Sequence, residues 1–171
     1  YLDNAANITY LHGTAHTNGN DADSIQVQVT DNGNTGAGGG GNINLGTVNV
    51  DITAINDDPF NAGGLPTDIA VTEDVASQVD LSAMDLSDVD AGGGSLTVTL
   101  TTATGGNLTA ASGGGVTVVG AGTGVITLTG TQAALNAYLD NAANITYLHG
   151  TAHTNGNDAD TIQVQVTDNG N

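Results

Sequence analysis

The chain has no lysine, no arginine and no cysteine, and each absence excludes a class of function. Without basic side chains it cannot neutralise phosphate, which excludes binding to nucleic acid and to anionic membranes. Without cysteine, it has no disulfide framework, no thiolate metal site and no cysteine nucleophile. No apolar run approaches the roughly 18 residues that a membrane-spanning helix needs.

Aromatic residues are also scarce, at 3% of the 171 residues. The core must therefore consist of Val, Ile, Leu and Ala side chains. The 26 glycines, together with many Thr and Asn residues, are typical of a β-rich chain with frequent turns. The composition predicts an all-β fold.

Acidic residues are abundant: the formal net charge is −18, and Glu73 is the only acidic residue that is not Asp. Such a chain repels itself unless another species supplies positive charge. Asp is short, suits turns and is the common ligand in calcium loops. An alternative is that Asp merely tolerates loop conformations. We expect divalent cations, Ca²⁺ above all, to bind the chain.

The chain contains an internal repeat. Residues 1–34 recur as residues 138–171, an offset of 137, with Ser24 replaced by Thr161 as the only difference. A period this long exceeds the roughly 20–50 residues of solenoid repeats and suits one complete β-sandwich per repeat. We therefore expect the chain to begin and end within repeats of a longer tandem array.

Alternation of apolar and polar residues predicts the strands. The clearest is residues 24–30, which should be half-buried through Ile25, Val27 and Val29. A phase slip at Gly46 predicts a bulge in the next strand, at 42–55, and these two strands should form a hairpin. Further strands are expected at 78–81, 95–102, 106–110, 115–120, 124–130, 145–148 and 161–167. Residues 131–140, capped by Thr131, are the one segment with a helical pattern.

These patterns predict three parts. Residues 1–55 should be the C-terminal part of one repeat, 56–66 an acidic linker, and 67–171 most of the next repeat.

Four short motifs follow one another along the chain. A strand runs into Asn56-Asp57-Asp58-Pro59, Val71-Thr72-Glu73-Asp74 follows, then Ser87-Asp88-Val89-Asp90-Ala91, and lastly Val164-Gln165-Val166-Thr167-Asp168-Asn169-Gly170. The chain thus resembles the tandem cadherin-like repeats of giant bacterial adhesins and exoproteins. The resemblance implies Ig/cadherin-like β-sandwich domains, with one short helix per repeat here, at the surface of a cell or outside it.

The resemblance also implies calcium at the junctions between repeats. At one junction it places Asn56, Asp57, Asp58, Asp88, Asp90 and Asp168, joined by Asp21 and Asp23 from the preceding repeat. At the next junction it places Glu73, Asp158 and Asp160. Calcium accepts six to eight oxygen ligands in flexible geometry. Without ions, repulsion among these carboxylates should loosen the joint.

Other motifs favour other readings less strongly. His12 and His16, and their copies His149 and His153, have the spacing of a zinc pair but lie in a Gly/Thr/Asn loop, where solvated histidines are expected. The GNDAD segments resemble a calcium nonapeptide but are never in tandem. No nucleophile elbow is present, so we expect no catalysis.

Two functions remain open. The first is a structural spacer of a long extracellular surface protein or fibre, rigidified by calcium, acting in adhesion or a matrix. The second is an adhesin module that binds a glycan or a cell surface, although no aromatic patch is visible. The expected partners are neighbouring repeats and, through lateral packing into fibres, other copies of the chain.

Overall fold

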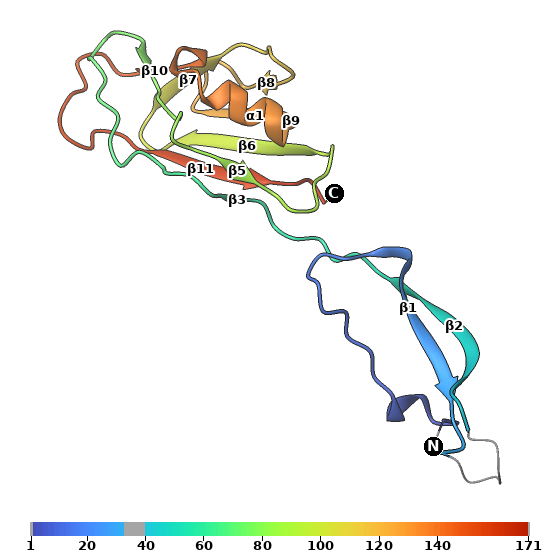
Figure 1. Cartoon of the computed structure of the whole chain (residues 1–171). Coiled ribbons are helices and arrows are strands. Elements are labelled where there is room, and N and C mark those ends of the chain that lie inside the picture. The colour runs from blue at the N-terminus through green and yellow to red at the C-terminus, as the bar shows by residue number, and fades with distance from the viewer. Residues whose placement is uncertain (1, 33–39, 171) are drawn as a thin grey trace. The chain divides into compact units, whose positions relative to one another are not determined.

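The computed structural model describes residues 2–32 and 40–170. The chain separates into two compact units, Tyr1–Ile55 and Asn56–Asn171 (Figure 1). Strands dominate both units, which confirms the all-β class. The second unit adds one α-helix, as the sequence predicts. Each unit also has a short 3₁₀ helix that the sequence analysis did not anticipate: η1 (Ala5–Asn7) and η2 (Ala142–Asn144).

The first unit is built on a hairpin of two antiparallel strands, β1 (Gly19–Val29) and β2 (Ile43–Ile52). The register passes from Val27 opposite Gly46 to Gln28 opposite Asn44, so Leu45 is an extra residue on β2. Gly46 has a φ of 136°, which other residues rarely adopt. The bulge predicted at Gly46 is confirmed.

The burial predicted for the strand at 24–30 is wrong in this first copy. Ile25, Val27 and Val29 are 41%, 38% and 50% exposed. No described residue of the first unit is buried, so the apolar face of β1 has no packed layer to cover it. The alternation in the sequence identifies the face correctly, but burial also needs an opposing layer.

The second unit contains nine strands among the residues that the structure describes. They are β3 (Phe60–Asn61), β4 (Ser77–Gln78), β5 (Leu86–Ser87), β6 (Ser95–Thr102), β7 (Gly106–Ala110), β8 (Thr117–Val119), β9 (Val125–Thr131), β10 (Ile145–His149) and β11 (Ile162–Thr167). The strands β6 and β7 have the predicted bounds. The two short strands β3 and β5 pair with each other, and neither was predicted. β3 lies within residues 56–66, the expected linker.

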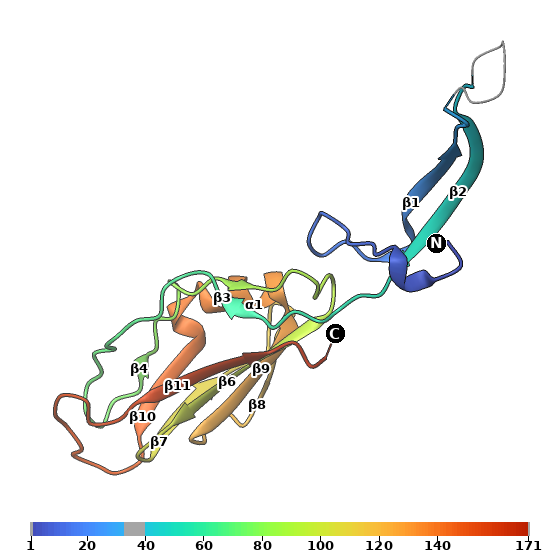
Figure 2. The ribbon, with the colours of Figure 1, turned by 90° about the horizontal axis from the view of Figure 1, so that it is seen from below.

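Two sheets and a helix enclose the hydrophobic core of this unit. One sheet has the strand order β11-β6-β9-β8 and the other β4-β10-β7 (Figure 2). Both contribute fully buried side chains to a single cluster, including Leu100, Leu108 and Ile126. Three apolar residues of β11, Ile162, Val164 and Val166, pack against this cluster while partly exposed.

The helix α1 (Gln132–Leu139) lies against this core. The side chain of Thr131 accepts a hydrogen bond from the backbone N–H of Ala134, which is the predicted cap. Leu135 and Leu139 are 0% and 1% exposed, as their spacing predicts. Within the described ranges, no helix is long and apolar enough to cross a membrane.

Candidate metal centre

Five of the predicted ligands come from three segments of the second unit. Asn56 and Asp57 lie before β3, Asp88 and Asp90 come just after the end of β5, and Asp168 comes directly after β11. Hydrogen bonds join them in two groups. The side chain of Asn56 donates to Asp168, and the backbone N–H of Asp57 donates to Asp90. Because Asn56 and Asp57 are adjacent in the chain, the two groups are neighbours.

The turn after β5 holds two carboxylates by backbone hydrogen bonds. Asp88 Oδ1 accepts from the N–H groups of Asp90 and Ala91, at 3.2 and 3.0 Å. Asp90 Oδ2 accepts from the N–H of Asp57 at 2.9 Å. An Asp that binds the backbone two residues onward is the usual way to fix such a turn.

The other oxygen of each carboxylate is buried without a hydrogen bond. Asp88 Oδ2 and Asp90 Oδ1 are the two buried side-chain oxygens that lack a partner in the described part of the chain, and Asp88 is only 9% exposed. A buried polar atom left unpaired costs free energy, and a charged one costs more. The chain has no lysine or arginine that could compensate them.

Asp168 is buried, with 6% of its surface exposed. Its pKa is lowered by a hydrogen bond from the N–H of Gly170 to Oδ1 and by one from Asn56 Nδ2 to Oδ2, at 2.9 and 2.5 Å. The site therefore combines carboxylate and amide oxygens, which suits a hard cation such as calcium.

Hydrogen bonds link these residues in pairs, but the structure does not gather their carboxylates around one point. Over residues 2–32 and 40–170, no three His, Asp or Glu side chains are grouped as they would be around a metal ion. Asp58, predicted to join them, is exposed.

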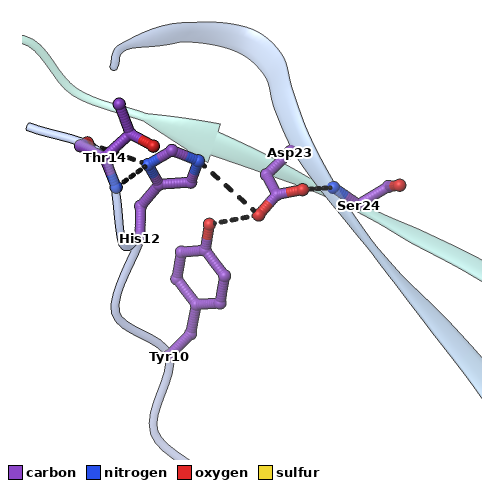
Figure 3. Close-up of polar contacts among 5 residues, drawn as sticks. All are labelled: Tyr10, His12, Thr14, Asp23 and Ser24. Carbon is purple, nitrogen blue, oxygen red and sulfur yellow. Dashed lines mark hydrogen bonds and ion pairs between the residues drawn. The ribbon is translucent and has the colours of Figure 1, made fainter. Parts of the chain in front are cut away.

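The predicted ligands of the first unit make other contacts. Asp23 accepts hydrogen bonds from the Tyr10 hydroxyl and the N–H of Ser24, both at 2.7 Å, and His12 Nε2 lies 3.9 Å away (Figure 3). The Tyr10 bond, then the Ser24 bond, lower the pKa of Asp23. Burial and this pairing raise the pKa of Tyr10 to about 12. Asp21 accepts from Asn20 Nδ2 at 3.0 Å.

Asp160, the copy of Asp23, anchors a turn between strands. Its oxygens accept from the Tyr147 hydroxyl and from four backbone N–H groups, those of Ala103, Thr104, Gly106 and Thr161. Burial opposes ionisation, but the bonds outweigh it and lower the pKa of Asp160 to about 2. Gly106 begins β7, so the carboxylate fixes the turn that leads from β6 into β7.

Two further predicted ligands hold a surface loop. Glu73 accepts a hydrogen bond from Asn155 Nδ2 at 2.7 Å, and Asp158 accepts one from Asn157 at 2.6 Å. The neighbouring Asp74, which the sequence analysis did not name as a ligand, contacts the ring of His153 at 2.9 Å and accepts a hydrogen bond from its backbone N–H at 3.0 Å. Asp74 and His153 lie far apart in sequence, so only the folded structure shows that they are in contact.

Two of the four histidines contact their own loops. His12 Nδ1 lies 3.0 Å from the carbonyl of Thr14, and His149 Nδ1 lies 3.2 Å from that of Thr151. Local contacts of this kind occupy a ring nitrogen that a metal would otherwise use. Comparison with models of protein families, with curated proteins and with solved structures finds no match to the chain.

Proposed function

We propose that this chain is a repeat segment of a long extracellular surface protein or fibre, of bacterial type. In this proposal each repeat is a cadherin-like β-sandwich, and calcium makes it a rigid spacer in adhesion or a matrix. The repeat has no catalytic role. The repetition of residues 1–34 at 138–171 supports this reading, because near-identical copies suit reach and stiffness better than recognition.

One observation carries the calcium part of the proposal. Asp88 Oδ2 and Asp90 Oδ1 are buried without a hydrogen-bond partner, in a chain that has no lysine or arginine. A bound cation would compensate both oxygens. Calcium fits better than zinc or magnesium, because the donors are oxygens and calcium tolerates irregular geometry.

The residues of the site explain what the ion would stabilise. Asn56 and Asp57 lie where the chain enters the second unit, Asp88 and Asp90 lie in a turn after β5, and Asp168 ends β11. An ion shared among them would tie the entering segment to the body of the unit. Extracellular modules of this kind bind calcium at about 0.1 to 1 mM, so calcium outside a cell would fill the site.

Thermal unfolding with calcium and with EDTA tests the site. At calcium ten times the Kd, binding stabilises by about 1.4 kcal/mol, so the melting temperature should rise. In the variants Asp90→Asn and Asp88→Asn, calcium should no longer raise the melting temperature. In EDTA these variants should be more stable than the wild type, because a buried, uncompensated charge is removed. Asp140→Asn, an exposed position, is the control with the same charge change.

The opposite pattern would overturn the calcium site. If calcium raises the melting temperature of the wild type and of Asp90→Asn equally, the ion binds elsewhere. Small-angle scattering tests whether calcium makes the chain a rigid spacer. The distribution of particle sizes should be narrower with calcium than with EDTA. An unchanged distribution would remove the mechanical part of the proposal while leaving the ion site intact.

A further inference from the structure

The short strand β5, which leads into the turn of the candidate calcium site, is held by different partners on its two sides. On one side it pairs with β3, and the N–H of Ala62 donates to the carbonyl of Asp85 at 2.7 Å. Successive residues of a strand point their backbone groups to opposite sides. Those of Leu86 and Asp88 therefore point away from β3. On that side they meet two amide side chains of the helix α1.

Asn136 of α1 pairs with Leu86 as a neighbouring strand would. Its Oδ1 accepts a hydrogen bond from the N–H of Leu86 at 2.9 Å, and its Nδ2 donates to the carbonyl of Leu86 at 3.0 Å. The same Nδ2 donates to Asp85 Oδ1 at 2.9 Å. Leu86 is fully buried, so its backbone groups would be costly to leave unpaired. One side chain therefore fixes the backbone of β5 at this point.

Gln132 of α1 pairs with the first residue after β5. Its Oε1 accepts a hydrogen bond from the backbone N–H of Asp88 at 3.2 Å. Gln132 and Asn136 are four residues apart in the helix, which is about 6 Å along its axis. Leu86 and Asp88 are two residues apart in extended chain, which is about 6.7 Å. Because the two spacings match, the helix presents one amide to each backbone position.

The placement of these amides is the reverse of what a covering helix usually shows. The polar residues of such a helix normally face solvent. In α1, however, the alanines Ala133 and Ala137 are exposed, whereas Gln132 and Asn136 are partly buried. Asn is also a poorer helix former than Ala, so the bonds of Asn136 to β5 offset a cost to the helix. The two amides therefore serve the contact with β5.

Taking the proposed calcium site as given, we propose that Gln132 and Asn136 position its turn. Asp88 Oδ2 and Asp90 Oδ1 are buried without partners, which favours opening of the turn when no ion is bound. The amides oppose this opening, because they hold the backbone from which both carboxylates project. Without them fewer molecules have a closed turn, and the apparent Kd for calcium rises in proportion. By linkage, bound calcium stabilises the contact of α1 with β5.

Calcium titration by isothermal calorimetry tests the positioning. Gln132→Ala should raise the Kd about fivefold, because it removes one hydrogen bond to the turn. Gln163→Ala removes an exposed amide from β11 and should bind calcium as the wild type does. Circular dichroism in EDTA shows that each variant is folded. If Gln132→Ala binds as tightly as the wild type, the positioning role is overturned and the calcium site stands. If the wild type binds no calcium, the site itself fails and the positioning role with it.

Hydrogen exchange separates positioning from a general effect on stability. In EDTA, the amides of Asp88 and Ala91 should exchange at least about fivefold faster in Gln132→Ala than in the wild type, and those of β6 should not change. In the wild type, calcium should slow exchange in α1. Equal acceleration in β6 would show a loss of global stability and overturn the proposal. Asn136→Ala should act in the same direction; if it does not fold, Gln132→Ala decides.

Discussion

The two copies of the repeated sequence show which features are set locally and which depend on packing. Residues 2–32 and 139–169 differ only at Ser24 and Thr161. One copy lies in a unit where none of the described residues is buried, and the other contributes to a packed core. Features that both copies share are therefore encoded by the segment itself, and features that differ come from its surroundings.

The shared features are turns and short-range hydrogen bonds. Both copies have a 3₁₀ helix capped by an Asn side chain, Asn4 in one and Asn141 in the other. Both place a Tyr hydroxyl on an Asp carboxylate, at 2.7 Å from Tyr10 and 2.9 Å from Tyr147. These contacts form without a core because their partners are near in sequence, two residues apart in the helix cap and 13 residues apart in the Tyr–Asp pair.

The differences lie in burial and in long-range donors. Ile145 is 2% exposed, whereas its copy Ile8 is 61% exposed. Asp160 gains three backbone donors at the start of β7 and just before it, whereas the contacts of Asp23 are with Tyr10, Ser24 and His12. The same side chain therefore stabilises a domain in one copy and only a loop in the other.

Truncating the same leucine in both copies should give the largest contrast. Leu139→Ala removes a side chain that is 1% exposed, and we expect it to lower the free energy of unfolding by about 3 kcal/mol. Leu2→Ala, at a residue 81% exposed, should change it by less than about 0.5 kcal/mol. Urea unfolding followed by circular dichroism measures both, and similar losses would show that the copies pack alike.

Removing the anchoring carboxylate should give the next largest contrast. Asp160→Ala leaves the N–H groups of the turn before β7 unpaired, and we expect a loss of about 2 kcal/mol in EDTA. Asp23→Ala should cost less than about 0.5 kcal/mol, because its partners are exposed. The same urea titration tests this pair. A cost at Asp23 equal to that at Asp160 would disprove the distinction.

The two Asp residues that follow the repeated strand should respond differently to calcium. Asp168→Asn should remove most of the calcium stabilisation, about 1.4 kcal/mol at ten times the Kd. Its copy Asp31→Asn carries the same charge change and should leave that stabilisation intact. Melting curves with calcium and with EDTA compare the two. If Asp31→Asn abolishes the response, the ion does not depend on the second unit alone.

The smallest expected effect is the loss of folding stability at low pH that depends on Asp160. Its pKa is about 2 in the folded chain, below the ordinary value of 3.8, so its contribution is complete above pH 5 and is lost as pH falls toward 2. We expect this contribution to the free energy of unfolding to be about 1 kcal/mol, because water screens part of the electrostatic effect. Urea midpoints between pH 5 and 2.5 should fall less steeply in Asp160→Asn than in the wild type. Parallel slopes would contradict this assignment.

The sequence predicted well what depends on local pattern. Short strand-like segments between glycine turns located β6 and β7 at their observed bounds, and Thr131 marked the start of α1. It could not predict that β1 would be exposed, since burial depends on an opposing layer. It also missed β3 and β5, because two-residue strands have no periodicity.

The candidate site was predictable only in part, for a similar reason. Motif order brought together Asn56, Asp57, Asp88, Asp90 and Asp168, and hydrogen bonds link them in two groups. Spacing could not distinguish Asp90, which keeps a buried oxygen without a partner, from Asp160, whose carboxylate binds a turn. That distinction depends on which backbone N–H groups the fold brings within reach.

Calcium titration by isothermal calorimetry, at neutral pH, tests the central claim most directly. The wild type should bind calcium with a Kd of about 0.1 to 1 mM, and the double variant Asp88→Asn/Asp90→Asn should show no binding in that range. Asp140→Asn should bind as the wild type does. If the wild type shows no heat of binding, or if the double variant binds equally well, the buried oxygens of Asp88 and Asp90 do not form a calcium site.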